Sequence, residues 1–258
     1  MRQRILRTGL IVGVGAMGSL VARGGGVEGP ALAVYVSAAK VEPRKEVDDA
    51  TKNALKAKRD EATKARKALE KQLNDQLGKK RETWPPDKDE QLYRLEEAEA
   101  IANADYEYRK IDPQAIGDAV KDLSRACGGE GLQAGRKSRV TLTDSAKDAD
   151  LAVEVLARRS QKELGAVVPS HCWVLFSIGP GGKTDPARFA QVPEGYRPRK
   201  FLLQAWKIAS PTPERPYFIF EGYNGGGTPI GCHGAAANSA SQVIEKFVED
   251  NYPTLAGQ

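Results

Sequence analysis

Two hydrophobic periodicities divide the chain. Between residues 43 and 127 apolar residues recur every three or four positions, which predicts helices, whereas from residue 139 onward they alternate with polar residues, which predicts strands. We expect helices over 43–77, 87–110, 113–127 and 237–252, and strands over 34–38, 139–143, 151–158, 172–178, 201–208 and 217–223. This order predicts an α+β fold: a mostly antiparallel sheet with helices on one face, plus a long charged α-helical hairpin.

The same pattern suggests how the chain is organised. We expect a leader over residues 1–33, a first strand over 34–43, the charged hairpin over 44–110 and an α+β domain over 111–258. The predicted hairpin has few apolar positions, so the core is expected in the last of these regions.

The two predicted hairpin helices carry opposite charge. Residues 52–71 contain eight Lys or Arg against three acids, and residues 87–107 contain two bases against eight acids. An antiparallel hairpin would set these charges against each other, and such a charge run is typical of a solvated helix pair. A docking arm for a protein partner is the alternative. Because the basic charge can be answered within the chain, no nucleic-acid partner is expected.

The first residues have the order of a secretory signal. Arg2, Arg4 and Arg7 precede an uncharged, largely apolar run over 9–22, and Ala31-Leu32-Ala33 offers a processing site of the A-x-A type. The apolar run is too short for a comfortable membrane anchor, so no stable membrane span is expected.

A glycine pattern within this leader imitates a nucleotide-binding turn. Gly13, Gly15 and Gly18 have the spacing of the dinucleotide fingerprint. However, the glycines at 24–26 would stop the required helix, and a charged helical region follows instead of alternating strands and helices. We therefore expect no cofactor.

Both histidines of the chain adjoin a cysteine. His171 precedes Cys172 and Cys232 precedes His233, while Cys127 stands alone on a predicted helix, where it suits a small core residue. We expect a disulfide between Cys172 and Cys232, since two strand-edge segments can bring one sulfur from each to bonding distance.

Two chemical alternatives remain open for these residues. His171, Cys172, Cys232 and His233 form a Cys₂His₂ set that suits zinc, although neighbours on an extended chain point to opposite sides. Cys232 lies close to the start of the last predicted helix and could act as a nucleophile, with His171 or His233 as the base. That arrangement would make the protein a thiol-dependent hydrolase.

Residues 112–252 resemble a group of extracytoplasmic bacterial α/β domains. The segment "DADLAVEV" and the final amphipathic helix are similar to those of TolB amino-terminal domains and curli-secretion-type lipoproteins. The resemblance implies binding of partners in the cell envelope without catalysis, and no site residues follow from it. Residues 44–110 and the lack of a lipid-anchoring cysteine depart from that pattern.

Together these observations predict an exported bacterial protein, periplasmic or extracellular. We expect a non-enzymatic partner-binding or structural module of the cell envelope, with a protein partner on the helical hairpin. The thiol hydrolase is the alternative function. The sequence leaves the oligomeric state open.

Overall fold

The structure is a computed structural model that describes residues 31–40, 47–110, 112–128, 139–162, 169–192, 200–202, 204–225 and 231–256. Residues 31–258 form one compact unit, to which the description below applies. The predicted leader, with its glycine pattern, lies outside the described residues except for Ala31, Leu32 and Ala33.

A seven-stranded sheet forms the centre of this unit, in the order β2-β1-β3-β4-β7-β6-β5. The strands are β1 (Leu32–Ala38), β2 (Val140–Leu142), β3 (Leu151–Gln161), β4 (His171–Pro180), β5 (Lys200–Leu202), β6 (Ala205–Ala209) and β7 (Phe218–Gly225). Strand β1 pairs in parallel with β2 and β3, and all other pairings are antiparallel. The prediction of an α+β fold with a mostly antiparallel sheet is confirmed.

The helices are α1 (Asp49–Leu77), α2 (Pro86–Glu107), α3 (Pro113–Cys127), α4 (Pro186–Phe189) and α5 (Cys232–Ala256), and single 3₁₀ turns lie at Arg81–Thr83 and Ala146–Asp148. Helices α1, α2 and α3 begin where the sequence supplies a starting signal, an Asp cap or a Pro in the first turn. The side chain of Asp48 accepts from the amide of Thr51 at the start of α1, and Asp112 does the same for Gln114 in α3. Gly78, with a φ of 84°, ends α1.

Three predicted elements differ most from the structure. The first hairpin helix begins at Asp49 instead of residue 43. The strand expected over 201–208 is a hairpin of β5 and β6, in which Leu202 pairs with Ala205. No glycine or proline marks that turn, so an apolar run of this length reads as one strand. The last helix begins at Cys232 instead of residue 237, because its alanines favour helix and pack against the sheet.

The main core lies between one face of the sheet and helices α3 and α5. Phe176, Phe218 and Phe220 from the sheet meet Phe247 and other apolar residues of α5, all fully buried or nearly so. Gly222 in β7 permits the close approach of α5, since a Cβ there would lie 2.9 Å from the backbone nitrogen of Ala240. Helices α3 and α5 thus share one face of the sheet, as the predicted α+β fold requires.

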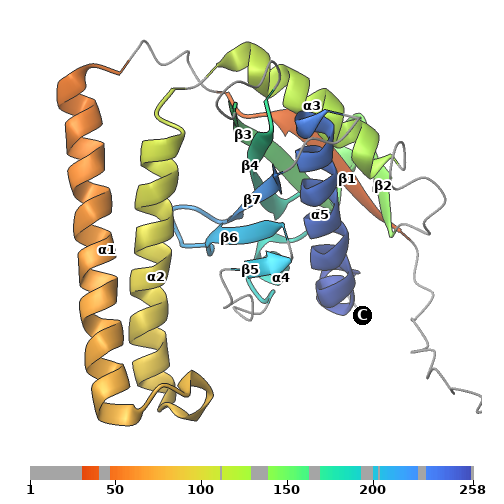
Figure 1. Cartoon of the computed structure of the whole chain (residues 1–258). Coiled ribbons are helices and arrows are strands. Elements are labelled where there is room, and N and C mark those ends of the chain that lie inside the picture. The colour runs from red at the N-terminus through yellow and green to blue at the C-terminus, as the bar shows by residue number, and fades with distance from the viewer. Residues whose placement is uncertain are drawn as a thin grey trace, which may run out of the picture. The chain divides into compact units, whose positions relative to one another are not determined.

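Helix α2 lies against the opposite face of the sheet (Figure 1). Ala100 and Tyr108 pack there with Ala157, Leu175 and Ile208. Helix α1 packs on α2 and has Leu73 as its one buried residue. The hairpin therefore uses α2 to contact the sheet, while α1 lies along α2 (Figure 1).

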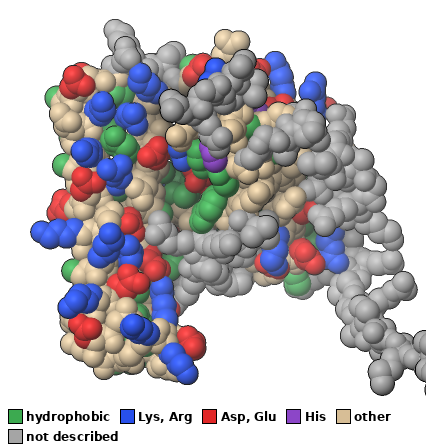
Figure 2. Space-filling model, in the orientation of Figure 1, with side chains coloured by type: hydrophobic (Ala, Val, Ile, Leu, Met, Phe, Trp, Pro, Cys, Tyr) green, Lys and Arg blue, Asp and Glu red, His purple; other side chains and the backbone are tan. Residues whose placement is uncertain are grey.

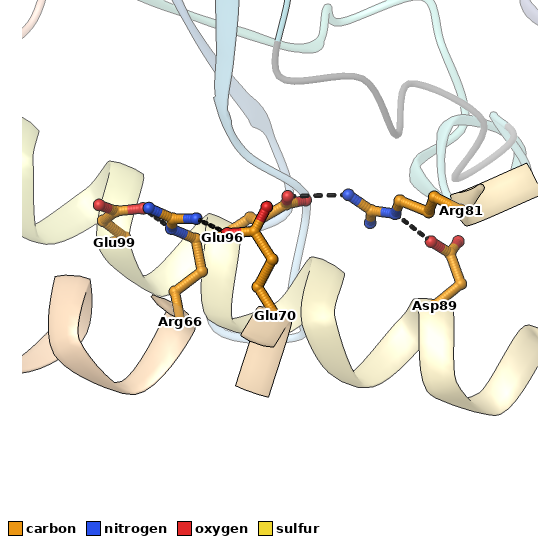
Figure 3. A network of polar contacts seen from close by, with 6 residues as sticks. All are labelled: Arg66, Glu70, Arg81, Asp89, Glu96 and Glu99. Atoms are coloured by element: carbon orange, nitrogen blue, oxygen red, sulfur yellow. Dashed lines mark hydrogen bonds and ion pairs between the residues drawn. The ribbon is translucent and has the colours of Figure 1, made fainter. Parts of the chain in front are cut away.

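Opposite charges join the two hairpin helices, as predicted. Arg66 in α1 lies between Glu70 of its own helix and Glu99 of α2, and its Nε is 2.7 Å from the Glu99 carboxylate (Figure 3). Nearer the connection, Arg81 contacts both Asp89 and Glu96 (Figure 3). These contacts explain how a helix with little apolar surface is held in place.

The spacing of apolar residues in the second hairpin helix predicts that Leu92, Leu95, Ala98, Ala102 and Tyr106 face inward, and this prediction is partly wrong. Leu92 and Ala102 are buried as expected, but Ala98 is exposed and the neighbouring Glu99 is buried. A periodic count of apolar residues assigns the carboxylate to solvent, whereas Thr63 and Arg66 of α1 draw it into the helix interface.

Candidate binding cleft

A cleft of ≈ 450 Å³ lies between α2 and the sheet face that α2 partly covers. We call it the aromatic cleft. Its lining includes Asn103 and Glu107 from α2 and, from the sheet, Arg159, Gln161, Trp173, Trp206 and Glu221. Figure 2 shows hydrophobic side chains in the hollow beside the charged surface of the hairpin.

Aromatic rings from three adjacent strands lie on this face of the sheet. Trp173 in β4 is the register partner of Tyr223 in β7, and their ring centroids are 5.1 Å apart. The ring of Trp206 in β6 is 5.7 Å from that of Tyr223. All three side chains are partly exposed. This face of the sheet thus presents aromatic surface that the described helices do not fully cover.

His171 and Gly225 fix the position of Tyr223. The Nδ1 atom of His171 is 2.8 Å from the hydroxyl of Tyr223, and the two rings are stacked. A Cβ on Gly225 would lie 1.7 Å from that hydroxyl and 3.0 Å from His171 Nδ1. Gly225 therefore provides the space in which the His171–Tyr223 contact forms.

The guanidinium group of Arg159 lines the aromatic cleft. The guanidinium of Arg159 in β3 lies 3.7 Å above the ring of Trp173, its register partner in β4. Its Nη1 is 3.2 Å from Glu107, and its Nη2 is 3.9 Å from Glu221. Arg159 Nε is buried without a hydrogen-bond partner among the described residues.

Glu221 is held in a partly apolar setting. The hydroxyl of Tyr108 donates to Glu221 at 2.6 Å. Burial raises the pKa of Glu221, and the Glu107 carboxylate adds to that effect, whereas Tyr108 and Arg159 oppose it. Burial, followed by the Glu221 charge, raises the pKa of Tyr108 well above its usual value.

Lys207 lies at the wall of the cleft where α2 meets the sheet. Its ammonium group contacts the hydroxyl of Tyr93 and lies 2.8 Å from Ser210 Oγ, while Glu97 accepts from the amide of Ser210. Burial lowers the pKa of Lys207 to about 8, and Glu90 opposes that shift. These contacts anchor α2 to β6.

The structure places the sulfur atoms of Cys172 and Cys232 at bonding distance, 2.11 Å, which joins β4 to the first residue of α5. It is the pair expected from the sequence. Cys127 is buried and unbonded, and burial raises its pKa to about 12. A bonded sulfur carries no thiolate, so Cys232 is not a nucleophile while the bridge is intact.

The two histidines lie in separate hydrogen-bond arrangements. His171 contacts Tyr223 on β7, whereas His233 accepts from Arg158 Nε at 2.8 Å. Burial lowers the pKa of His233, and the Arg158 guanidinium adds to this. Among the described residues, no group of three or more His, Cys, Asp or Glu side chains is positioned to hold a metal ion.

The sequence reasoning missed the residues that line the aromatic cleft. Alternation along "HCWVLFSI" puts Trp173 on the face opposite Cys172, and alternation along "YFIFEGY" puts Glu221 on the same face as Tyr223. Two aromatic residues that face away from the core could therefore have indicated a binding surface on this side of the sheet. Nothing in the sequence pattern indicated that α2 lies above them.

No protein family, curated protein or solved structure matches the chain. The resemblance of residues 112–252 to envelope domains therefore stays an expectation. In the part of the chain that the structure describes, no helix is long and apolar enough to cross a membrane.

Proposed function

We propose that this protein is a non-enzymatic binding module that holds its ligand in the aromatic cleft. The observation that carries this proposal is the pair of partly exposed tryptophans, Trp173 and Trp206, in a hollow that also contains several polar side chains. A concave site with aromatic surface and a few convergent polar groups is the usual form of a ligand site, and its volume falls within the common range of about 300–1,000 Å³.

The arrangement favours binding over catalysis. The guanidinium of Arg159 contacts the carboxylates of both Glu107 and Glu221, so each of these charges already has a partner of opposite sign. The thiol-hydrolase alternative would need the sulfur of Cys232, which the bridge to Cys172 occupies. Binding thus uses the groups in the state in which the structure holds them.

Affinity-selection mass spectrometry with a mixture of small neutral, cationic and anionic compounds tests the binding role. Asn103→Trp places a large side chain in the cleft, and Asn53→Trp makes the same change at an exposed position of α1. We expect compounds that are retained by the native protein and by Asn53→Trp and lost from Asn103→Trp. Retention of the same compounds by all three proteins, or of none by any, would contradict the proposal.

Export is the second part of the proposal. It is supported by the arginine-rich start, the apolar run over 9–22 and a cysteine pair suited to oxidising surroundings. Residues 1–40 fused to alkaline phosphatase, which is active only outside the bacterial cytoplasm, should give activity and a shortened fusion. An inactive, full-length fusion would rule export out.

A protein partner on the hairpin is a further candidate role. Lys56, Lys64 and Lys67 are exposed at helical spacing on α1, and Asp60, which lies between them at the same spacing, is paired with Arg59. We call these three lysines the basic stripe, which suits an acidic protein surface. Replacing all three with glutamate should abolish co-purification of an acidic partner, whereas the same change at the exposed Lys79 and Lys80 should leave it. Equal recovery with both variants would exclude this stripe.

A further inference from the structure

We propose that the aromatic cleft binds a neutral oligosaccharide. This inference rests on the binding role proposed above and adds the chemical class of the ligand. It depends on three properties of the cleft: its aromatic surface, its planar polar side chains and its balanced charge.

The aromatic surface suits the apolar face of a sugar ring. Trp173 and Trp206 both line the cleft, and Tyr223 lies between them, 5.1 Å and 5.7 Å from their rings. The C–H groups of a pyranose form a flat apolar patch that packs against an aromatic ring, and successive residues of a chain can use successive rings. Arg159 covers one face of Trp173 at 3.7 Å, and Tyr223 supports the two tryptophans without lining the cleft, so the sugar packs on Trp206 and on the exposed part of Trp173.

The polar side chains suit neighbouring hydroxyl groups. Asn103, Gln161 and Glu107 line the same cleft. Amide and carboxylate groups present two polar atoms in one plane, and such a pair can bond two adjacent hydroxyls of a sugar at once. A purely apolar ligand would bury these groups without partners, which is unfavourable.

The charges of the cleft disfavour ionic ligands. The lining holds two cations, Arg159 and Lys207, and two carboxylates, Glu107 and Glu221. Arg159 is paired with Glu107 at 3.2 Å and Lys207 contacts Ser210 at 2.8 Å, so an anionic ligand would meet the carboxylates as well as cations that already have partners. A cationic ligand would compete with the same guanidinium, which already occupies the face of Trp173 at 3.7 Å. A neutral ligand with many hydroxyls accepts both signs of charge as hydrogen-bond partners.

Tryptophan fluorescence gives a direct test. The chain has three tryptophans, and Trp84 lies in the hairpin outside the cleft lining. In the full chain with Trp84→Phe, the emission reports only the two tryptophans of the cleft. We expect saturable changes on titration with at least one of three hexasaccharides: β-1,4-linked glucose, N-acetylglucosamine or mannose. Trp206→Ala and Trp173→Ala should each weaken that affinity by about tenfold, as loss of an aromatic stacking contact does.

The controls separate failure of the ligand class from failure of the site. Tyr35→Ala changes a partly exposed aromatic residue of β1 outside the cleft lining and should leave the affinity unchanged. If a tryptophan variant does not fold, Asn103→Trp blocks the cleft from α2 and should abolish binding. Saccharide binding that survives these cleft variants would overturn the proposal.

Two ionic probes complete the test. If choline or a hexamer of deoxythymidine binds in a Trp206-dependent manner while no hexasaccharide does, the carbohydrate assignment is wrong and the binding role stands. If neither the saccharides nor the ionic probes bind, and affinity selection also finds no ligand, both proposals fail.

Discussion

Two helices of similar length, α1 and α5, differ in how much apolar surface they bury and in how much they depend on ion pairs. Helix α5 has 25 residues, fifteen of them buried, whereas α1 has 29 residues and buries only Leu73. Helix α5 packs apolar side chains against the sheet. Helix α1 contacts α2 through ion pairs such as Arg66–Glu99 and Lys58–Asp105 and through one small apolar cluster around Leu73. Hydrophobic burial therefore dominates in the body, and charge contributes more in the hairpin.

Because of this difference, we expect the hairpin to be less stable than the sheet. Exposed ion pairs contribute little, about 0–1 kcal/mol each, and salt weakens them, whereas buried aromatic residues contribute several kcal/mol. The outer hairpin helix should therefore open before the sheet does. Helix α2 belongs to both regions, since Tyr108 bonds Glu221 on its sheet side and Glu99 binds Arg66 on its other side.

The largest effect is expected in the sheet core. Phe220→Ala removes a fully buried ring that lies among Phe176, Phe218 and Phe247. We expect the free energy of unfolding to fall by about 3–5 kcal/mol, because the cavity cannot close around the missing ring. Urea unfolding followed by circular dichroism measures this. Leu77→Ala, at a 38% exposed position of α1, is the matched control and should change it by less than about 0.5 kcal/mol. Similar losses in both variants would remove the contrast.

The bridge between β4 and α5 should have an effect of comparable size. Its cysteines are 60 residues apart, and closing such a loop stabilises by about 4 kcal/mol in the chain-entropy model. Replacing Cys172 and Cys232 with alanine, in a Cys127→Ala background that excludes other pairings, should reduce the free energy of unfolding by about that amount. Equal stability with and without a reductant in the Cys127→Ala protein would show that the bridge does not form in solution.

A smaller loss is expected within the hairpin. Arg66→Ala leaves the buried carboxylate of Glu99 without its cation, which should reduce stability by about 1–3 kcal/mol. Hydrogen exchange should become faster in α1 while the protection of α5 changes little. Lys71→Ala removes an exposed pair with Asp75 and is the control, with little expected change. Loss of protection in α5 equal to that in α1 would mean that hairpin and sheet unfold together.

The sequence predicted those parts of the fold that depend on local pattern. Alternation located β3, β4 and β7, and Asp112-Pro113 located the start of α3, because strand period and helix capping act over a few residues. The Cys172–Cys232 pair could also be predicted, since three cysteines allow only a few pairings. Elements whose ends carry no glycine, proline or capping residue were harder to predict, as the β5–β6 hairpin shows.

The candidate site was harder to predict from the sequence because it is formed by packing between segments that are distant along the chain. Asn103 and Glu107 reach Trp173 and Arg159 only through the placement of α2 on the sheet. That placement depends on contacts such as Tyr93 with Ser210, 117 residues apart. Tyr93 and Glu99 were not predicted to be buried, because each satisfies its polar group with a partner from another element.

The smallest expected effect is a pH dependence at the junction between hairpin and sheet. The pKa of Lys207 is about 8 in the folded protein, below its usual value of 10.5. Between these values the unfolded chain binds more protons, so the free energy of unfolding should rise with pH, by an amount on the order of 1 kcal/mol. Above pH 10 the raised pKa of Tyr108 acts in the opposite direction, so unfolding is best followed from pH 7 to 9.5.

Lys207→Met isolates this contribution. The methionine keeps an unbranched chain and removes the titrating group, so the rise between pH 8 and 9.5 should disappear. Because Lys207 contacts Tyr93 of α2 and Ser210 next to β6, hydrogen exchange at pH 8 and 9.5 locates the effect. Slower exchange at the higher pH confined to α2, after correction for the intrinsic rate, would show that α2 opens separately from the sheet. An unchanged pH slope in Lys207→Met would assign the dependence to another group, and a uniform change across the sheet would show that α2 and the sheet open as one unit.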